Sequence, residues 1–179
     1  MTTFTVIHVQ ETEHVLAAVS LAAPPEPAPP VGDLVGAGLP LRLLGLPAPD
    51  AITVPATRLA AVTVDSDSAV EDPRGRGVVE LVQNGELRHQ LELLKDGAAS
   101  VDINLNPTGA KVTHTGGVGV QLAVLVVMEQ NGPQRLLSGV IPATTTEVTL
   151  AASFTSGEKW RTVTFVHGFT PHAEEVTVA

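Results

Sequence analysis

The sequence predicts an all-β protein built as an antiparallel β-sandwich of roughly a dozen short strands. Two Asn-Gly pairs each separate two segments rich in Val and Leu, and further segments of strand length are rich in Val, Thr and Ile. Asn and Gly tolerate the positive φ angles of a type I′ turn, so each pair predicts a β-hairpin. The regular spacing of turn signals along the chain is typical of a sandwich.

The first predicted hairpin consists of residues 4–9 and 14–22, which flank the polar turn Glu11-Thr12-Glu13. The second segment also suits a helix, because Val15 and Val19 are one helical turn apart. A turn this tight would pair the second segment with the strand before it, which favours the strand.

A proline-rich connector follows at residues 24–30, where Pro occupies five of seven positions. Such a segment is expected to run as an extended, polyproline-like path between two sheets. The alternative is a docking segment, because Pro27 and Pro30 have the spacing of a PxxP motif. The glycine-rich residues 32–38 after it are expected to be a loop or a short buried turn.

Two short strands are predicted next, at residues 52–54 and 59–64. A hairpin then joins residues 78–83 to residues 87–94 through Asn84-Gly85.

Another strand, at residues 99–105, ends at the turn formed by residues 106–109. The second Asn-Gly hairpin joins residues 120–129 to residues 135–141. Pro133 follows its turn and has no backbone N–H, so this hairpin is expected to open with a longer loop or to lie at a sheet edge. The last predicted strands are residues 147–154 and 160–166.

A short phrase occurs twice, as Val54-Pro55-Ala56-Thr57 and as Ile141-Pro142-Ala143-Thr144, 87 residues apart. This offset, close to half the chain, predicts a duplication into halves 1–86 and 87–179. Because the Asn84-Gly85 hairpin spans the midpoint, the halves are expected to share a sheet within a single compact body, residues 1–179.

In strand count and turn rhythm the chain resembles immunoglobulin-like sandwiches, without their Cys-Trp-Cys pattern. The predicted fold is therefore an immunoglobulin-like, pseudo-duplicated sandwich.

Composition narrows the possible partners and compartments. The 179 residues include no Cys, and ten Lys and Arg against nineteen Asp and Glu give a net charge of −9. This charge disfavours nucleic acid, and the longest apolar run, residues 122–128, is too short to span a membrane. Without Cys or an apolar leader the chain is expected to be cytoplasmic, and its Arg-, Ala- and Pro-rich usage is typical of a GC-rich bacterial genome.

Histidines and carboxylates are the residues most able to support chemistry. The tail gathers His167, His172 and Glu174 within eight residues, which predicts a metal site or an acid–base pair if the side chains converge. If Pro171 begins a turn after a strand, the two rings need not meet. Similarly, His8 and His14 flank the first turn, where they either face each other or are exposed.

Other patterns indicate structure more than chemistry. Residues 65–72 are rich in Asp, Glu and Ser but lack the spacing of a calcium-binding loop. The glycine-rich residues 116–120 lack the Lys and the following Ser or Thr of a phosphate-binding loop, so a bend or bulge is expected. Trp160, the single Trp, is expected to fill the core. No catalytic residue and no cofactor are predicted.

These observations favour a non-catalytic structural or protein-interaction protein. Only 16% of the residues are charged, against about 25% in typical proteins, which suggests a covered surface. The expected partner is another protein or a second copy of the chain, as in a bacterial or phage-derived assembly. The alternatives are a small-molecule or metal-binding protein that uses the C-terminal His and Glu residues, and an acid–base enzyme.

Overall fold

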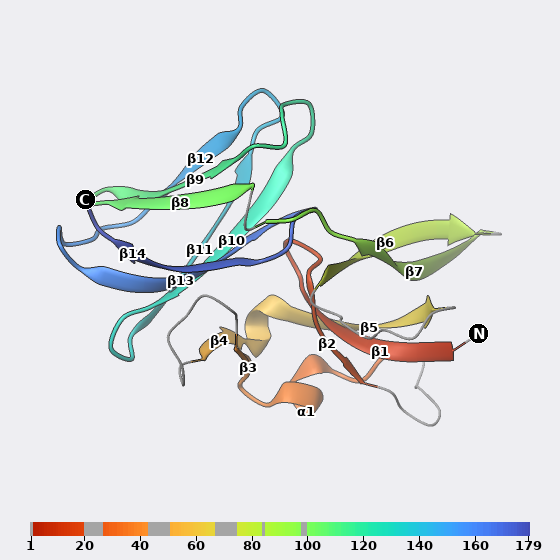
Figure 1. The fold of residues 1–179 in the computed structure, drawn as a ribbon. Coiled ribbons are helices and arrows are strands. Elements are labelled where there is room, and N and C mark those ends of the chain that lie inside the picture. Colours follow the sequence, from red (N-terminus) through yellow and green to blue (C-terminus); the bar gives the residue numbers. More distant parts are fainter. Residues whose placement is uncertain (1, 20–26, 43–50, 67–74, 84, 98–99) are drawn as a thin grey trace. The chain divides into compact units, whose positions relative to one another are not determined.

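A computed structural model describes residues 2–19, 27–42, 51–66, 75–83, 85–97 and 100–179. These residues form an all-β protein with several antiparallel sheets, which confirms the predicted class (Figure 1). The described helical elements are α1 (Val31–Val35) and the short 3-10 turn η1 (Ala56–Arg58). Within the described ranges, no helix is long and apolar enough to cross a membrane.

The strands of the described residues are, in chain order, β1 (Thr2–Val9), β2 (Val15–Val19), β3 (Gly38–Leu41), β4 (Ile52–Pro55), β5 (Leu59–Ser66), β6 (Arg76–Gln83), β7 (Glu86–Leu93), β8 (Val101–Asn106), β9 (Gly109–His114), β10 (Leu122–Glu129), β11 (Gln134–Ile141), β12 (Glu147–Ala151), β13 (Lys159–Val166) and β14 (His172–Thr177). Strands β3 and β4 form a two-stranded sheet.

The chain divides into two compact units. Unit 1 comprises Met1–Leu39 and Thr53–Leu94, and unit 2 comprises Pro40–Ile52 and Lys95–Ala179. The hairpin of β6 and β7, which the sequence places across the midpoint, belongs wholly to unit 1. The single body 1–179 with halves 1–86 and 87–179 stays a prediction.

Unit 1 contains a three-stranded sheet in the order β2-β1-β5 and the two-stranded sheet of β6 and β7. A single antiparallel bridge between His14 and Gly77 joins them, and the Val78 N–H donates a 2.8 Å hydrogen bond to the Glu13 carbonyl. The bridge lies just before β2 begins, so it links the first turn to β6 while the two sheets keep the separate orders β2-β1-β5 and β6-β7. Val78 also belongs to the core of unit 1, with Val6, Val15 and Val64.

Local turn chemistry explains the first hairpin of unit 1. Residues 4–9 and 14–22 are predicted to pair, and β1 pairs with β2 over the described part of this range. The turn closes because Glu13 takes a positive φ of 62° and its N–H donates to the Val9 carbonyl at 2.8 Å.

The glycine-rich residues 32–38 differ from the prediction. A loop or a short buried turn is expected there, but residues 31–35 form α1, which has no buried residue. Pro30 precedes the helix with φ −51° and ψ 134°, and Gly36 ends it at φ 63°. A proline that fixes φ just before the first turn and a glycine that accepts positive φ after the last one delimit this short helix.

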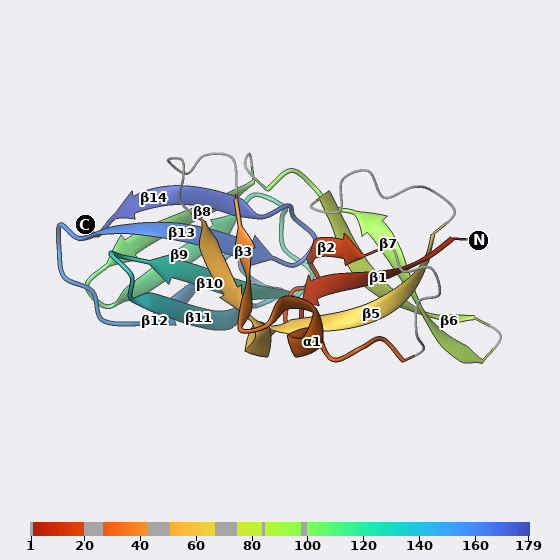
Figure 2. The same ribbon diagram turned by 90° about the horizontal axis from the view of Figure 1, so that it is seen from below.

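Unit 2 contains two sheets of its own. One has the order β11-β10-β13-β14, where β13 lies between β10 and β14 (Figure 2), and the other has the order β12-β9-β8. Residues of both sheets share one core, which includes Leu105 of β8, Val112 of β9, Val126 of β10 and Leu150 of β12. The predicted role of Trp160 is confirmed, since its side chain is buried in this core and meets the Phe154 ring edge-on at 5.7 Å.

The second Asn-Gly hairpin forms as its residues predict. Asn131 and Gly132 both have positive φ, 49° and 103°, and the Gln130 N–H donates to the Pro133 carbonyl at 3.0 Å. Pairing of β10 with β11 begins only at Glu129 and Gln134, and β11 lies at the edge of its sheet. The longer loop and the edge position expected from Pro133 are therefore both present.

The two copies of the repeated phrase have similar local structure. Val54 is the last but one residue of β4, and Ile141 is the last residue of β11. A short turn then leads to the next strand, from β4 to β5 through η1 and from β11 to β12. The duplication itself stays a prediction, because a shared turn is a local property.

Several expectations fall partly outside the described residues. These are the first residues of the proline-rich connector (24–26), Asn84 of the first Asn-Gly pair, and the loop part of the acidic segment (67–72).

The core of unit 2 generates a test of stability. Leu105 is completely buried, whereas Leu93 in unit 1 is 74% exposed. We expect Leu105→Ala to destabilise unit 2 by about 2–5 kcal/mol, because the change removes buried methyl groups and leaves a cavity. Leu93→Ala should change stability by less than about 0.5 kcal/mol. Urea unfolding of both variants measures this, and equal losses would contradict the description of the core.

Candidate functional site

The C-terminal residues predicted to bind a metal are only partly brought together. His172 opens β14, and its Nε2 lies 3.0 Å from Oε1 of Glu174, two residues further along the strand. His167 lies in the turn before β14 and lines a separate hollow. Within the described part of the chain, no group of three or more His, Cys, Asp or Glu side chains is arranged to hold a metal ion.

The two histidines of the first hairpin have separate neighbours. Nδ1 of His8 lies 3.0 Å from Oε2 of Glu13, and Nδ1 of His14 lies 2.9 Å from the Thr12 hydroxyl. Both rings are buried. They contribute to the packing around the turn, and neither lines a described cavity with a third ionisable group.

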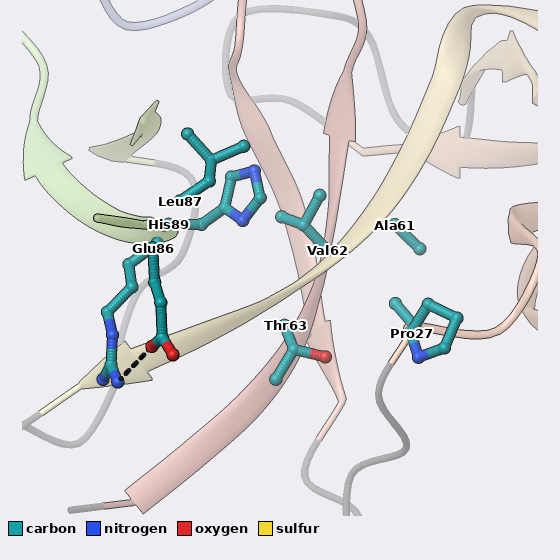
Figure 3. A pocket seen from close by; sticks show the side chains of 9 residues that line it. Pro27, Ala61, Val62, Thr63, Glu86, Leu87 and His89 are labelled. Carbon is teal, nitrogen blue, oxygen red and sulfur yellow. Dashed lines mark hydrogen bonds and ion pairs between the residues drawn. The ribbon is translucent and has the colours of Figure 1, made fainter. Parts of the chain in front are cut away.

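A larger opening lies in unit 1. A groove of about 490 Å³ is lined by Ala61, Val62 and Thr63 of β5, by residues 86–89 of β7, and by Pro27 and Ala28. Figure 3 shows Leu87 and His89 on one side, Pro27 on the other, and Ala61 and Val62 between them. The end of the proline-rich connector therefore forms one wall of this groove.

The lining pattern shows that the groove follows strand edges. Successive residues of a strand point to opposite faces, so a cavity that contacts one face would touch every second residue. Here consecutive residues of both β5 and β7 line the groove. Each of these strands also lies at the end of the strand order of its sheet. The groove therefore lies between the edge strands β5 and β7, which are not paired with each other but contact one another along part of their length, with Val62 and Leu91 packed against the same core.

Strand β5 carries no charged residue from Leu59 to Val64, and β2 at the opposite edge of the same sheet is uncharged as well. Charged residues on an edge strand normally discourage pairing with another chain. By contrast, β7 carries Glu86, Arg88 and Glu92. Of these two uncharged edges, β5 lines the groove, whereas β2 does not and begins just after the His14–Gly77 bridge.

Several apolar side chains of the β6–β7 hairpin are exposed. Val82 and Leu87 are directly opposite each other at the tip of the β6–β7 hairpin, and they are 76% and 58% exposed. Leu81 and Leu93 of the same hairpin are exposed as well. Val82 and Leu87 form an exposed apolar pair at the tip, whereas Leu81 faces the opposite side of the hairpin and Leu93 lies at its other end.

The charge of unit 1 is strongly negative. Eleven Asp and Glu against four Arg give its sequence a formal net charge of −7, out of −9 for the chain. Beside the groove, an oxygen of Glu86 lies 3.3 Å from the Arg88 guanidinium, and Glu80 lies 3.5 Å from His89. The unit therefore favours cationic ligands at long range.

A second, smaller opening lies in unit 2. This hollow of about 170 Å³ is lined by Lys95, His114 and His167, by glycines of the bends around them, and by apolar residues that include Phe169. The bend begins at Gly116, where an added Cβ would lie 2.7 Å from Phe169 Cζ and 3.1 Å from His114 Nδ1. Only glycine allows the backbone to approach these two rings so closely.

His114 at this hollow is held in one tautomer. The Gly116 N–H donates to its Nδ1 at 3.0 Å, so the neutral ring carries its proton on Nε2. Burial, and to a lesser extent the nearby Lys95 ammonium, lower the pKa of His114 from its usual 6.5. The ring is therefore neutral at physiological pH.

Sequence reasoning missed both openings. His114 and His167 are 53 residues apart in the chain, and only the pairing of the strands brings them to one hollow. The groove depends on which two edges end up facing each other, which no local pattern encodes. The absence of charge from Leu59 to Val64 was a readable signal for an undefended edge.

No protein-family model matches the sequence, and neither a curated protein nor a solved structure matches it.

The lowered pKa of His114 generates a test by pH. The unfolded chain protonates this residue at a higher pH than the folded chain does, so stability decreases as pH falls through about 6.5. His114→Gln removes this contribution, and its unfolding free energy should decrease less between about pH 7.5 and pH 5. Urea unfolding at the two pH values measures the difference. An equal or steeper loss in the variant would contradict the assignment.

Proposed function

We propose that the chain is a non-catalytic protein-interaction protein that binds an extended, cationic segment of a partner protein in the groove between β5 and β7. The observation that carries this proposal is the uncharged edge of β5 along the groove. An extended peptide that pairs with such an edge adds a strand to the sheet, and its alternate side chains enter the spaces beside it.

Charge favours a different protein over a second copy of this chain. Two copies would bring together two units of net charge −7 each, and this repulsion opposes pairing between them. A segment that carries Lys or Arg is attracted by the same charge. The carboxylates of Glu80, Glu86 and Glu92 on the hairpin are suited to contact such residues.

The apolar tip of the hairpin supports the same ligand. Val82 and Leu87 offer apolar contact at the tip of the hairpin, and Leu87 also lines the groove. The ligand expected from these features alternates apolar side chains with Lys or Arg.

For unit 2 the proposal is an immunoglobulin-like sandwich, the kind of module that often occurs in interaction proteins. If strands β8 to β14 are lettered in chain order as A, B, C, C′, E, F and G, the two sheets read A-B-E and C′-C-F-G. Immunoglobulin-like sandwiches likewise place A, B and E in one sheet and C, F and G in the other. The shared core of the two sheets supports this interpretation.

Peptides of opposite charge test the binding proposal. The probe is a blocked peptide of about eight residues in which Val alternates with Lys, a length typical of one strand. Fluorescence anisotropy should show saturable binding that weakens as salt is raised, because charge contributes to the affinity. A peptide in which Val alternates with Glu should not bind.

A matched pair of variants locates the site. Ala61 lines the groove and is half-buried. Ala61→Glu should strengthen binding of the Lys peptide about two- to fivefold, and Ala61→Lys should weaken it at least as much. The same two substitutions at Val140, an exposed residue of β11 in unit 2, should leave the affinity unchanged. Equal effects at both positions, or no binding by the wild type, would contradict the proposal.

A further inference from the structure

The hollow in unit 2 has a positive charge balance in a negatively charged chain. Among the described residues that line it, the ionisable ones are Lys95, His114 and His167, and none is Asp or Glu. Because His114 is held neutral, Lys95 supplies the fixed charge. An ammonium group at a hollow without a carboxylate in its lining favours an anionic ligand.

Backbone hydrogen bonds place Lys95 beside the turn that carries Phe169. Its N–H donates to the Gly168 carbonyl at 2.9 Å, and its carbonyl accepts from the Thr170 N–H at 2.7 Å. Its Nζ lies 5.6 Å from the centre of the Phe169 ring. The exposed ammonium group therefore lies near an aromatic face beside the hollow, at a distance that allows a cation–π contact.

The remaining lining is apolar and accessible. Val118 and Val120 are 64% and 67% exposed at the rim, and Leu122 lies beside them. The volume of about 170 Å³ is below the roughly 300–1,000 Å³ of pockets that hold drug-sized ligands. A ligand with a negatively charged group and a short apolar tail fits this volume, because the lining combines the Lys95 ammonium with apolar side chains.

We propose that the hollow formed by Lys95, the glycine-rich bend at residues 116–120 and Phe169 binds the carboxylate of a short aliphatic acid. The carboxylate lies at the Lys95 ammonium, and the alkyl chain contacts Val118 and Val120. This site is independent of the groove in unit 1, so either can fail without the other.

Titration of the full-length, ¹⁵N-labelled protein with sodium butyrate tests the site. We expect saturable shifts in the amide resonances of residues 116–120 and 168–169. The bound carboxylate offsets the charge of Lys95, so the pKa of His114, which faces Lys95 and His167 at this hollow, should rise on binding.

Two variants that each remove one Lys distinguish binding at the hollow from nonspecific attraction of butyrate to a positive charge. Lys95→Met should weaken butyrate binding about tenfold or more, because a charge-assisted contact is lost. Lys159→Met, which removes the same charge from β13, should bind butyrate as the wild type does. The amide spectrum of each variant verifies that it is folded.

Related ligands test whether the site requires both a carboxylate and an alkyl chain. Butyramide, which has no charge, should bind at least about tenfold more weakly than butyrate. Val120→Ser should weaken butyrate more than acetate, because only butyrate has an alkyl chain long enough to reach this residue.

Both a free acid and the C-terminus of a peptide supply such a carboxylate, and an N-terminally blocked dipeptide that ends in Val with a free carboxylate distinguishes the two sources. Stronger binding of butyrate or of the dipeptide identifies the source, and either result supports the site. Unchanged amide resonances at residues 116–120, equal binding by Lys95→Met, or inorganic phosphate binding as tightly as butyrate would overturn the proposal.

Discussion

Edge strands of antiparallel sheets carry backbone N–H and C=O groups that would pair with another chain unless they are covered or protected by charged side chains. The edge strands of this protein differ in how they meet this constraint. In unit 2 the edge strands carry charge: Glu174 and Glu175 on β14, Arg135 on β11, Asp102 on β8 and Glu147 on β12. In unit 1 the uncharged strand β2 follows the His14–Gly77 bridge, which links the first turn to β6. The edge of β5 is instead uncharged from Leu59 to Val64 and follows a groove. This difference between edges gives the proposed binding surface its location.

The parts of the fold that depend on local chemistry could be predicted from the sequence. The hairpin at Asn131-Gly132 forms because both residues accept positive φ, and Pro133 limits where the ladder can begin. Val124 to Met128 are all buried, as expected for an unbroken apolar run. Strands β3, β9 and β14 were missed because their residues do not look strand-like. Strand β9 begins with Gly109, and β14 contains Glu174 and Glu175, so pairing with neighbouring strands decides their conformation.

The candidate sites could not be predicted in the same way, because each depends on long-range pairing. The sequence directed attention to His167, His172 and Glu174, which are close in the chain. In the structure, His172 pairs with Glu174 on β14, while His167 lines a hollow with His114 and Lys95. The sheet register, more than proximity in sequence, decides which ionisable groups meet. The charge of the two proposed ligands follows that of their sites, since unit 1 has a net charge of −7 and none of the described residues that line the hollow in unit 2 is Asp or Glu.

Amide hydrogen exchange along β5 is the most direct test of the claim that its edge is open for a partner strand. In an antiparallel pair, alternate N–H groups of β5 point toward β1 and the others point away from it. The account predicts that the second set exchanges quickly in the free protein between Leu59 and Val64, and that it becomes protected when the Val-Lys peptide is bound. Equal protection of all these amides in the free protein, or unchanged exchange in the presence of saturating peptide, would contradict it.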